Sequence, residues 1–94
     1  MKVLVVYDVS TADPAGGRRL RRVARACEDY GQRVQKSVFE CTVGPTEWVL
    51  LRSRLLAEME PTADSVRCYF LAADTRVEHH GAKEPRDMDG PLVI

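Results

Sequence analysis

The sequence predicts an α+β domain in which two helices pack on one face of a single antiparallel sheet. Apolar residues alternate between strand-like runs and helical spacing, in the order strand, helix, a strand region, helix, strand. These elements fall within residues 1–72, and the 94-residue chain has the length of one small domain. If the middle region holds two strands, the order is βαββαβ, which is typical of the ferredoxin-like sandwich.

The first two elements are a buried strand and an amphipathic helix. Residues 2–9 form an almost unbroken apolar run that is interrupted at Asp8 and followed by turn-forming residues, the pattern of a central strand. From Gly17 the spacing becomes helical, and Gly31 is expected to cap the helix at its C-terminus. The predicted buried stripe of this helix consists of Leu20, Val23, Ala24, Cys27 and Tyr30.

The remaining elements are less uniform. Residues 33–43 predict strand, with a phase slip near Ser37 that indicates either a bend or a very tight strand pair. A second helix follows Gly44 and ends at Pro61. Its predicted apolar side consists of Trp48, Leu51, Leu55, Leu56 and Met59.

A last strand is predicted over 65–72, followed by a polar linker over 73–90. The chain then ends on the apolar residues 91–94, for which a short strand added to a sheet edge and a frayed tail are both open. Because no apolar run is long enough to span a bilayer and the opening run is broken at Asp8, we expect a cytoplasmic protein, neither membrane-spanning nor secreted.

The formal net charge is zero, but the charge is distributed unevenly. Residues 1–36 carry eight Lys and Arg against four Asp and Glu, while residues 37–94 carry six against ten. Five of the basic residues lie within eight positions of the first helix, on the side opposite its apolar stripe: Arg18, Arg19, Arg21, Arg22 and Arg25. A solvated face with ion pairs to Glu28 and Asp29 is the simpler interpretation. Two acids cannot neutralise five bases, so we favour binding to a nucleic-acid phosphate backbone.

Asp8 stands where the first strand ends, on the same side as Leu4 and Val6. A carboxylate there either caps a turn with Ser10 or Thr11, or binds a cation. One carboxylate alone is a poor magnesium site, because phosphoryl-transfer sites gather several oxygen ligands. Asp8 therefore indicates an enzyme only if a symmetric dimer brings two copies of it together.

Other chemistry-bearing residues predict little. Cys27, Cys41 and Cys68 lack metal-binding spacing, and we expect them to be free buried thiols. His79 and His80 are expected to be exposed loop residues. The sequence has no P-loop, no dinucleotide-binding glycine pattern and no Ser-His-Asp set, which excludes the common enzyme classes that depend on them.

Three segments together with the arginine-rich helix resemble the small CRISPR-associated Cas2 family of adaptation proteins. They are Val3-Leu4-Val5-Val6-Tyr7-Asp8-Val9, Arg33-Val34-Gln35-Lys36-Ser37-Val38-Phe39-Glu40-Cys41 and Asp64-Ser65-Val66-Arg67-Cys68-Tyr69. The residues from Val77 to Lys83, with the ending Gly90-Pro91-Leu92-Val93-Ile94, are similar to members that accompany type I-C systems.

The resemblance implies a ferredoxin-like homodimer in which the two Asp8 side chains face each other near the two-fold axis and hold Mg²⁺. It also implies that an extra C-terminal strand, residues 91–94, completes the partner's sheet. By position, Asp8 would be the catalytic and metal-binding residue, and Tyr7 and Phe39 would shape the site. The implied phosphate contacts are Arg18, Arg19, Arg22 and Arg33.

The family resemblance implies two different roles in antiviral defence. One is a magnesium-dependent endonuclease that cleaves single-stranded RNA, double-stranded DNA or both. The other is a non-catalytic DNA-binding adaptor at the core of the spacer-acquisition complex with the Cas1 integrase. A third class, a small-molecule or regulatory domain, predicts that the protein binds no nucleic acid.

Overall fold

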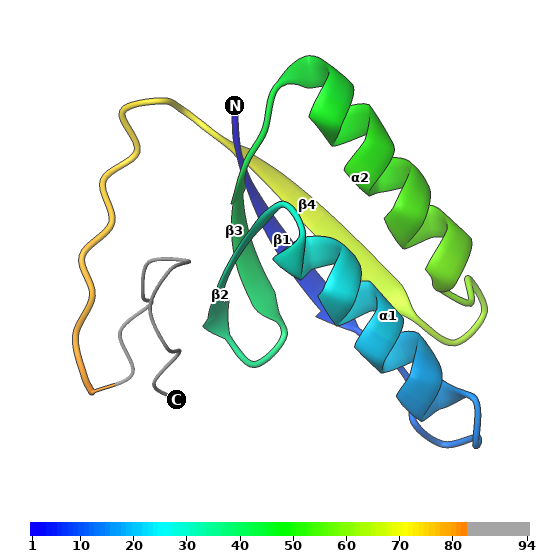
Figure 1. The fold of residues 1–94 in the computed structure, drawn as a ribbon. Helices are drawn as coiled ribbons and strands as arrows, with labels where there is room; N and C mark the ends of the chain where they lie inside the picture. Colours follow the sequence, from blue (N-terminus) through cyan, green and yellow to red (C-terminus); the bar gives the residue numbers. More distant parts are fainter. Residues whose placement is uncertain (83–94) are drawn as a thin grey trace.

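The computed structural model describes residues 1–82 and contains one four-stranded sheet and two helices (Figure 1). The element order is β1 (Lys2–Asp8), α1 (Gly16–Glu28), β2 (Gly31–Gln35), β3 (Val38–Thr42), α2 (Pro45–Glu58) and β4 (Ser65–Leu71). The strands lie in the order β2-β3-β1-β4, and every neighbouring pair is antiparallel. The predicted ferredoxin-like α+β arrangement is confirmed.

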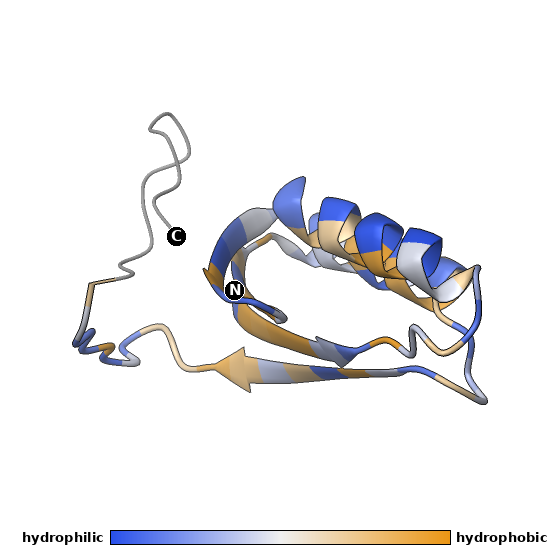
Figure 2. Cartoon of the chain, turned by 90° about the horizontal axis from the view of Figure 1, so that it is seen from below, coloured by the Kyte–Doolittle hydropathy of each residue, from blue (hydrophilic) through white to orange (hydrophobic). Residues whose placement is uncertain are grey.

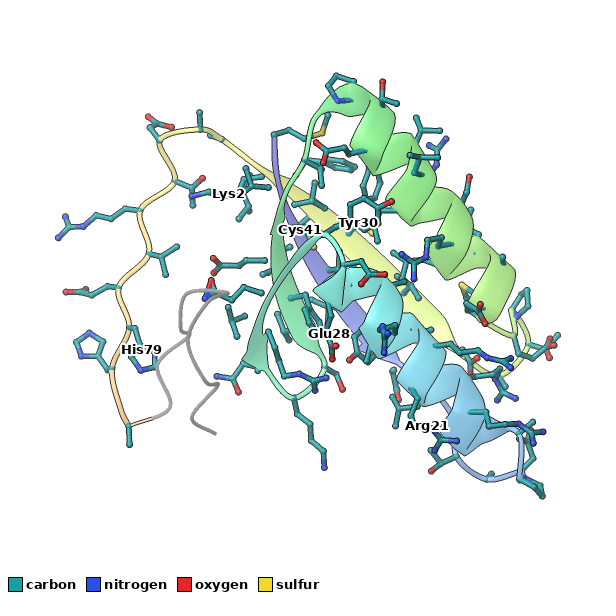
Figure 3. All side chains as sticks on the ribbon, viewed as in Figure 1. Lys2, Arg21, Glu28, Tyr30, Cys41 and His79 are labelled. Carbon is teal, nitrogen blue, oxygen red and sulfur yellow. The ribbon has the colours of Figure 1, made fainter. Side chains whose placement is uncertain are left out.

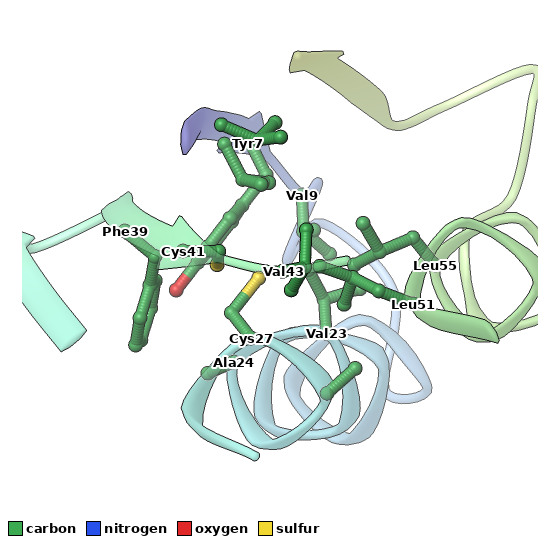
Figure 4. Packing of buried hydrophobic residues seen from close by; sticks show 13 residues of the cluster. Tyr7, Val9, Val23, Ala24, Cys27, Phe39, Cys41, Val43, Leu51 and Leu55 are labelled. Atoms are coloured by element: carbon green, nitrogen blue, oxygen red, sulfur yellow. The ribbon is translucent and has the colours of Figure 1, made fainter. Parts of the chain in front are cut away.

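The two helices lie side by side on one face of the sheet, and among the described residues no helix covers the other face (Figure 2). Along β1 the alternation is strict, with Val3, Val5 and Tyr7 buried beneath the helices. Side chains from all layers meet in the core shown in Figure 4, where Leu51 and Leu55 of α2 pack towards Val23 of α1. Burial of each of these leucine side chains stabilises the fold by about 1.5–3 kcal/mol.

The middle strand region is a strand pair, not a bent strand. β2 pairs with β3 in the register Gln32↔Glu40 and Arg33↔Phe39, then slips so that Gln35 lies opposite Val38. This slip is a bulge next to the turn, and it explains the break in alternation near Ser37.

Gly31 is the first residue of β2, so its expected role as a helix cap is wrong. The helix ends at Glu28, and Gly31 has no positive φ. A Cβ at this position would instead collide with the backbone of Glu40 and Cys41 on β3. Close approach of two strands therefore requires glycine here.

Leu56 also departs from the prediction, since its side chain is 60% exposed. Only Leu51 and Leu55 of α2 are buried, with Trp48 partly buried against Phe70 of β4 at a ring distance of 5.1 Å. The apolar side of α2 that contacts the sheet is thus narrower than the helical spacing indicated.

After β4 the chain leads away from the sheet, and residues 72–82 contain no helix or strand. His79 and His80 are exposed there, as predicted. The expected C-terminal strand at 91–94 and the rest of the linker lie outside the described residues. No helix between residues 1 and 82 has the length and apolar character needed to cross a membrane.

Candidate functional site

Asp8 is the last residue of β1, and its side chain is exposed. It lies opposite Ser65, the first residue of β4, on the face of the sheet that the helices leave uncovered. The half-buried residues Leu4 and Val6 share this face. Asp8 makes no side-chain hydrogen bond to any described residue, whereas the hydroxyl of Ser10 accepts one from the Ala12 amide at 3.3 Å. In the described structure the turn is therefore capped by Ser10, and the Asp8 carboxylate is free to bind a ligand.

Tyr7 and Phe39 lie on the opposite, helix-covered face of the sheet. Tyr7 is 4% exposed and Phe39 is fully buried, and their rings stack with centroids 6.2 Å apart (Figure 4). Burial raises the pKa of the Tyr7 hydroxyl above its usual value. Because successive residues of a strand point to opposite faces, these two rings support the strand that carries Asp8 from beneath and do not line the space around its carboxylate.

Arg33 is held by its own hairpin and by the end of α1. Its guanidinium lies over the ring of Phe39 at 4.9 Å and donates a hydrogen bond to the carbonyl oxygen of Lys36 at 2.7 Å. A second contact reaches the carboxylate of Glu28 at 3.3 Å. With its side chain 25% exposed, Arg33 stabilises the β2–β3 turn and presents only part of its charge to solvent.

The five arginines of α1 form two groups. Four are exposed on the outer side of the helix: Arg18, Arg21, Arg22 and Arg25. Arg22 and Arg25 reach carboxylates only at 3.9 and 4.0 Å, and within residues 1–82 Arg18 and Arg21 form no ion pair. Figure 3 shows Arg21 towards the N-terminal end of α1 and Glu28 at its other end. Ion pairs this exposed contribute little, so these guanidinium groups remain available to a polyanion.

Arg19 is the exception, because its side chain is only 14% exposed and pairs with a carboxylate that is fully inaccessible. That carboxylate belongs to Asp64, which directly precedes β4. Arg19 donates to it through Nε at 2.8 Å and through Nη2 at 3.3 Å. It also contacts the carboxylate of Asp13 at 3.4 Å.

Asp64 is the buried polar residue of the described core, and the sequence analysis did not assign it a role. Besides Arg19, it accepts hydrogen bonds from the backbone amides of Ser10 at 3.0 Å and Glu60 at 2.8 Å. These hydrogen bonds hold the pKa of the carboxyl at about 2, chiefly through Arg19. The available sequence signal was an aspartate in the turn between Pro61 and a strand, a position where carboxylates commonly accept backbone hydrogen bonds.

The cysteines offer no nucleophile. All three are free; Cys27 and Cys41 are buried as expected, whereas Cys68 is only half-buried. Burial raises the pKa of Cys27 to about 12 and that of Cys41 to about 11, so both stay protonated at neutral pH.

No described part of one chain gathers three or more His, Cys, Asp or Glu side chains that could hold a metal ion. A hollow of about 350 Å³ lies between the end of α1 and the hairpin, and its walls include Glu28, Asp29, Glu40 and Glu47. Four carboxylates make this hollow unsuitable for a polyanion. The residues suited to nucleic acid are the exposed arginines of α1, and the residue suited to a cation at a strand end is Asp8.

The comparisons with known proteins agree with the fold. Residues 1–78 match the family model described as CRISPR associated protein Cas2. The CRISPR-associated endoribonuclease Cas2 of Chlorobaculum tepidum is 62% identical over 96 residues, with 100% of both chains covered. The CRISPR-associated endonuclease Cas2 of Halalkalibacterium halodurans is 47% identical, again with 100% of both chains covered. The crystal structure of Streptococcus pyogenes Cas2 at pH 6.5 superimposes with a TM-score of 0.77 at 53% identity, covering 86% of this chain and 100% of that chain.

Proposed function

Because the chain belongs to the CRISPR-associated Cas2 family, we propose that it is a magnesium-dependent endonuclease that cleaves phosphodiester bonds in single-stranded RNA, double-stranded DNA or both. The observation that carries the proposal is the exposed Asp8 carboxylate at the end of β1, on the uncovered face of the sheet. Relatives of 62% and 47% identity carry the names endoribonuclease and endonuclease.

The chemistry of Asp8 fits magnesium. Mg²⁺ prefers oxygen ligands and commonly binds through one or two carboxylates, with water and substrate phosphate completing its shell. Asp8 supplies one such carboxylate, without a competing side-chain hydrogen bond in the described structure. A second copy of the chain would supply the other.

The homodimer is part of the proposal. The uncovered face carries the half-buried Leu4 and Val6 beside Asp8, so apolar contact with the same face of a second copy would bring the two carboxylates close to a two-fold axis. The family resemblance further suggests the Cas1 integrase as a partner. It also suggests that this chain accompanies a type I-C system.

In this dimer the two Asp8 side chains would hold the cation, and the exposed arginines of α1 would hold the nucleic-acid backbone. When bound, magnesium lowers the pKa of a coordinated water and stabilises negative charge on the phosphate. Arg18 and Arg22 orient the substrate by contacts to phosphate, which carry no base information. The substrate is therefore selected by backbone shape and not by sequence.

A second function is favoured by the exposed arginine face itself. Four guanidinium groups along one helix suit duplex phosphates whether or not Asp8 binds a cation. In this alternative the chain is a non-catalytic DNA-binding adaptor in the spacer-acquisition complex, and the integrase supplies the chemistry.

Cleavage of labelled single-stranded RNA and double-stranded DNA by wild type and Asp8→Asn, with magnesium and with chelator, tests the proposal. We expect cleavage that requires both magnesium and Asp8. Asp74→Asn, which removes an exposed carboxylate far from β1 in sequence, is the matched control and should cleave normally. Equal cleavage by wild type and Asp8→Asn would refute the nuclease proposal, and absent cleavage with intact DNA binding would support the adaptor.

A further inference from the structure

We propose that Asp64 and Arg19 are positioning residues for Asp8. The proposal rests on the nuclease function proposed above and gives a task to a buried ion pair that this function leaves unused. Asp64 cannot contact a substrate, since its side chain is fully inaccessible. Its effect must be transmitted through the residues that it holds.

Asp64 and Arg19 fix the chain that follows Asp8. Ser10, two residues after Asp8, donates its amide to the Asp64 carboxylate at 3.0 Å. The carbonyl oxygen of Ser10 accepts a hydrogen bond from Nη2 of Arg19 at 3.2 Å. Both backbone groups of Ser10 are thus held by the same ion pair.

Asp64 also fixes the start of β4, the strand that pairs with the end of β1. Ser65, the register partner of Asp8, directly follows Asp64 in the chain. The Asp64 carboxylate also accepts from the Glu60 amide at 2.8 Å, and the Asp64 amide donates to the Glu60 carbonyl oxygen at 2.7 Å. The first residue of β4 therefore begins from a fixed turn.

The start of α1 lies against the same loop. Gly16 packs so closely against Ser10 and Thr11 that a Cβ would collide with their backbones. Arg19 lies in the first turns of that helix. The pair thus joins the end of β1 and the start of β4, the two segments next to Asp8, to the first turn of α1. Substitution of residues that support a metal ligand commonly changes metal affinity or activity by about 10- to 100-fold.

This assignment changes the role of Arg19. Its implied contact with phosphate predicts that substitution weakens substrate binding and raises KM. A positioning role predicts instead that kcat falls while KM is unchanged, because the exposed arginines still bind the substrate.

The variant Asp64→Asn tests the proposal, since the amide keeps the shape but has one acceptor oxygen in place of two. We expect kcat to fall about 10- to 100-fold at unchanged KM. A second readout does not depend on activity. NMR spectra of Asp64→Asn should lose the cross-strand contact between Asp8 and Ser65 and keep the contact between Val3 and Phe70. Broadening of the Asp8 amide signal by Mn²⁺ should require higher metal concentration.

Arg19→Lys is the second variant, for the case in which Asp64→Asn does not fold. Lysine keeps the charge but cannot reach Asp64 and Ser10 together as the guanidinium does, so we expect the same changes in smaller measure. Asp29→Asn is the matched control, because it removes an exposed partner of Arg54 and should change none of these readouts.

The outcomes separate the two proposals. If wild type does not cleave, the nuclease function fails, and the Asp8–Ser65 contact and the Mn²⁺ titration still decide the positioning role. An unchanged Asp8–Ser65 contact in folded Asp64→Asn or Arg19→Lys would overturn the positioning role, as would a raised KM at constant kcat in Arg19→Lys. Loss of that contact with unchanged Mn²⁺ binding and unchanged kcat would overturn it as well.

Discussion

At the scale of single residues, Asp64 makes stability depend on pH in a defined window. Its pKa is about 2 in the folded chain, against an ordinary value of 3.8. Below the ordinary value the unfolded chain binds a proton that the folded chain does not, so the contribution of Asp64 is complete above about pH 4 and is lost as pH falls towards 2. We expect the difference in unfolding free energy between wild type and Asp64→Asn to shrink across this window.

Urea unfolding monitored at several pH values between 2 and 6 measures that difference. Asp29→Asn serves as the control, because its carboxylate is 47% exposed and contacts Arg54, which is 40% exposed. A difference in unfolding free energy between wild type and Asp64→Asn that stays constant from pH 5 to 2 would contradict the assignment of the lowered pKa to Asp64.

Some properties of single residues could be predicted from the sequence, and others could not. The alternation of β1 predicted the face on which Asp8 lies, because strand period alone decides it. It could not predict that Asp64 and Arg19 meet, since they stand 45 positions apart and only the folded loops bring them together. Arg19 thus looked equivalent to its neighbours Arg18 and Arg22 on the helix.

At the scale of elements, the helices and strands followed from local spacing, and the errors arose where tertiary contact decided. Gly31 resembled a helix cap because a helical run precedes it. Its actual constraint is the close approach of β3, where its register partner is Cys41, ten residues later in the sequence. Leu56 lies about 100° around the helix from Leu55, which places it just beyond the narrow stripe that packs on the sheet. Residues at the border of an apolar face cannot be assigned without the partner surface.

The exposed face of α1 carries a prediction at this same scale. Arg18→Gln combined with Arg22→Gln should weaken binding to duplex DNA and reduce the slope of log K against log salt by about 2, since each phosphate contact contributes about 0.9. Fluorescence anisotropy over a series of salt concentrations measures both. Arg52→Gln with Arg76→Gln removes the same charge from exposed positions outside α1 and should change the slope little. Equal effects of the two pairs would assign binding to net charge and not to this helix.

At the scale of the whole molecule, composition and element order were sufficient to predict the sandwich, but residues 1–82 of one chain gather no group of three or more side chains that could hold a metal ion. The helices cover one face of the sheet, and Asp8 stands on the other with Leu4 and Val6. A single carboxylate is a weak magnesium ligand set, and residue patterns within one chain carry no signal for what a second copy adds. Assembly is therefore the step that links this fold to the proposed chemistry.

Substitution of Val6 by lysine tests that step. A charge in the centre of the uncovered face should shift the chain from dimer to monomer, because burying an unpaired ammonium is costly, and it should abolish magnesium-dependent cleavage in parallel. Sedimentation at several protein concentrations measures the assembly, and circular dichroism confirms that the monomer is folded. Leu56→Lys, at a 60% exposed position on α2, should remain dimeric and active. A folded Val6→Lys monomer that still cleaves would mean that one Asp8 is enough, and a Val6→Lys dimer would mean that the two copies associate through another surface.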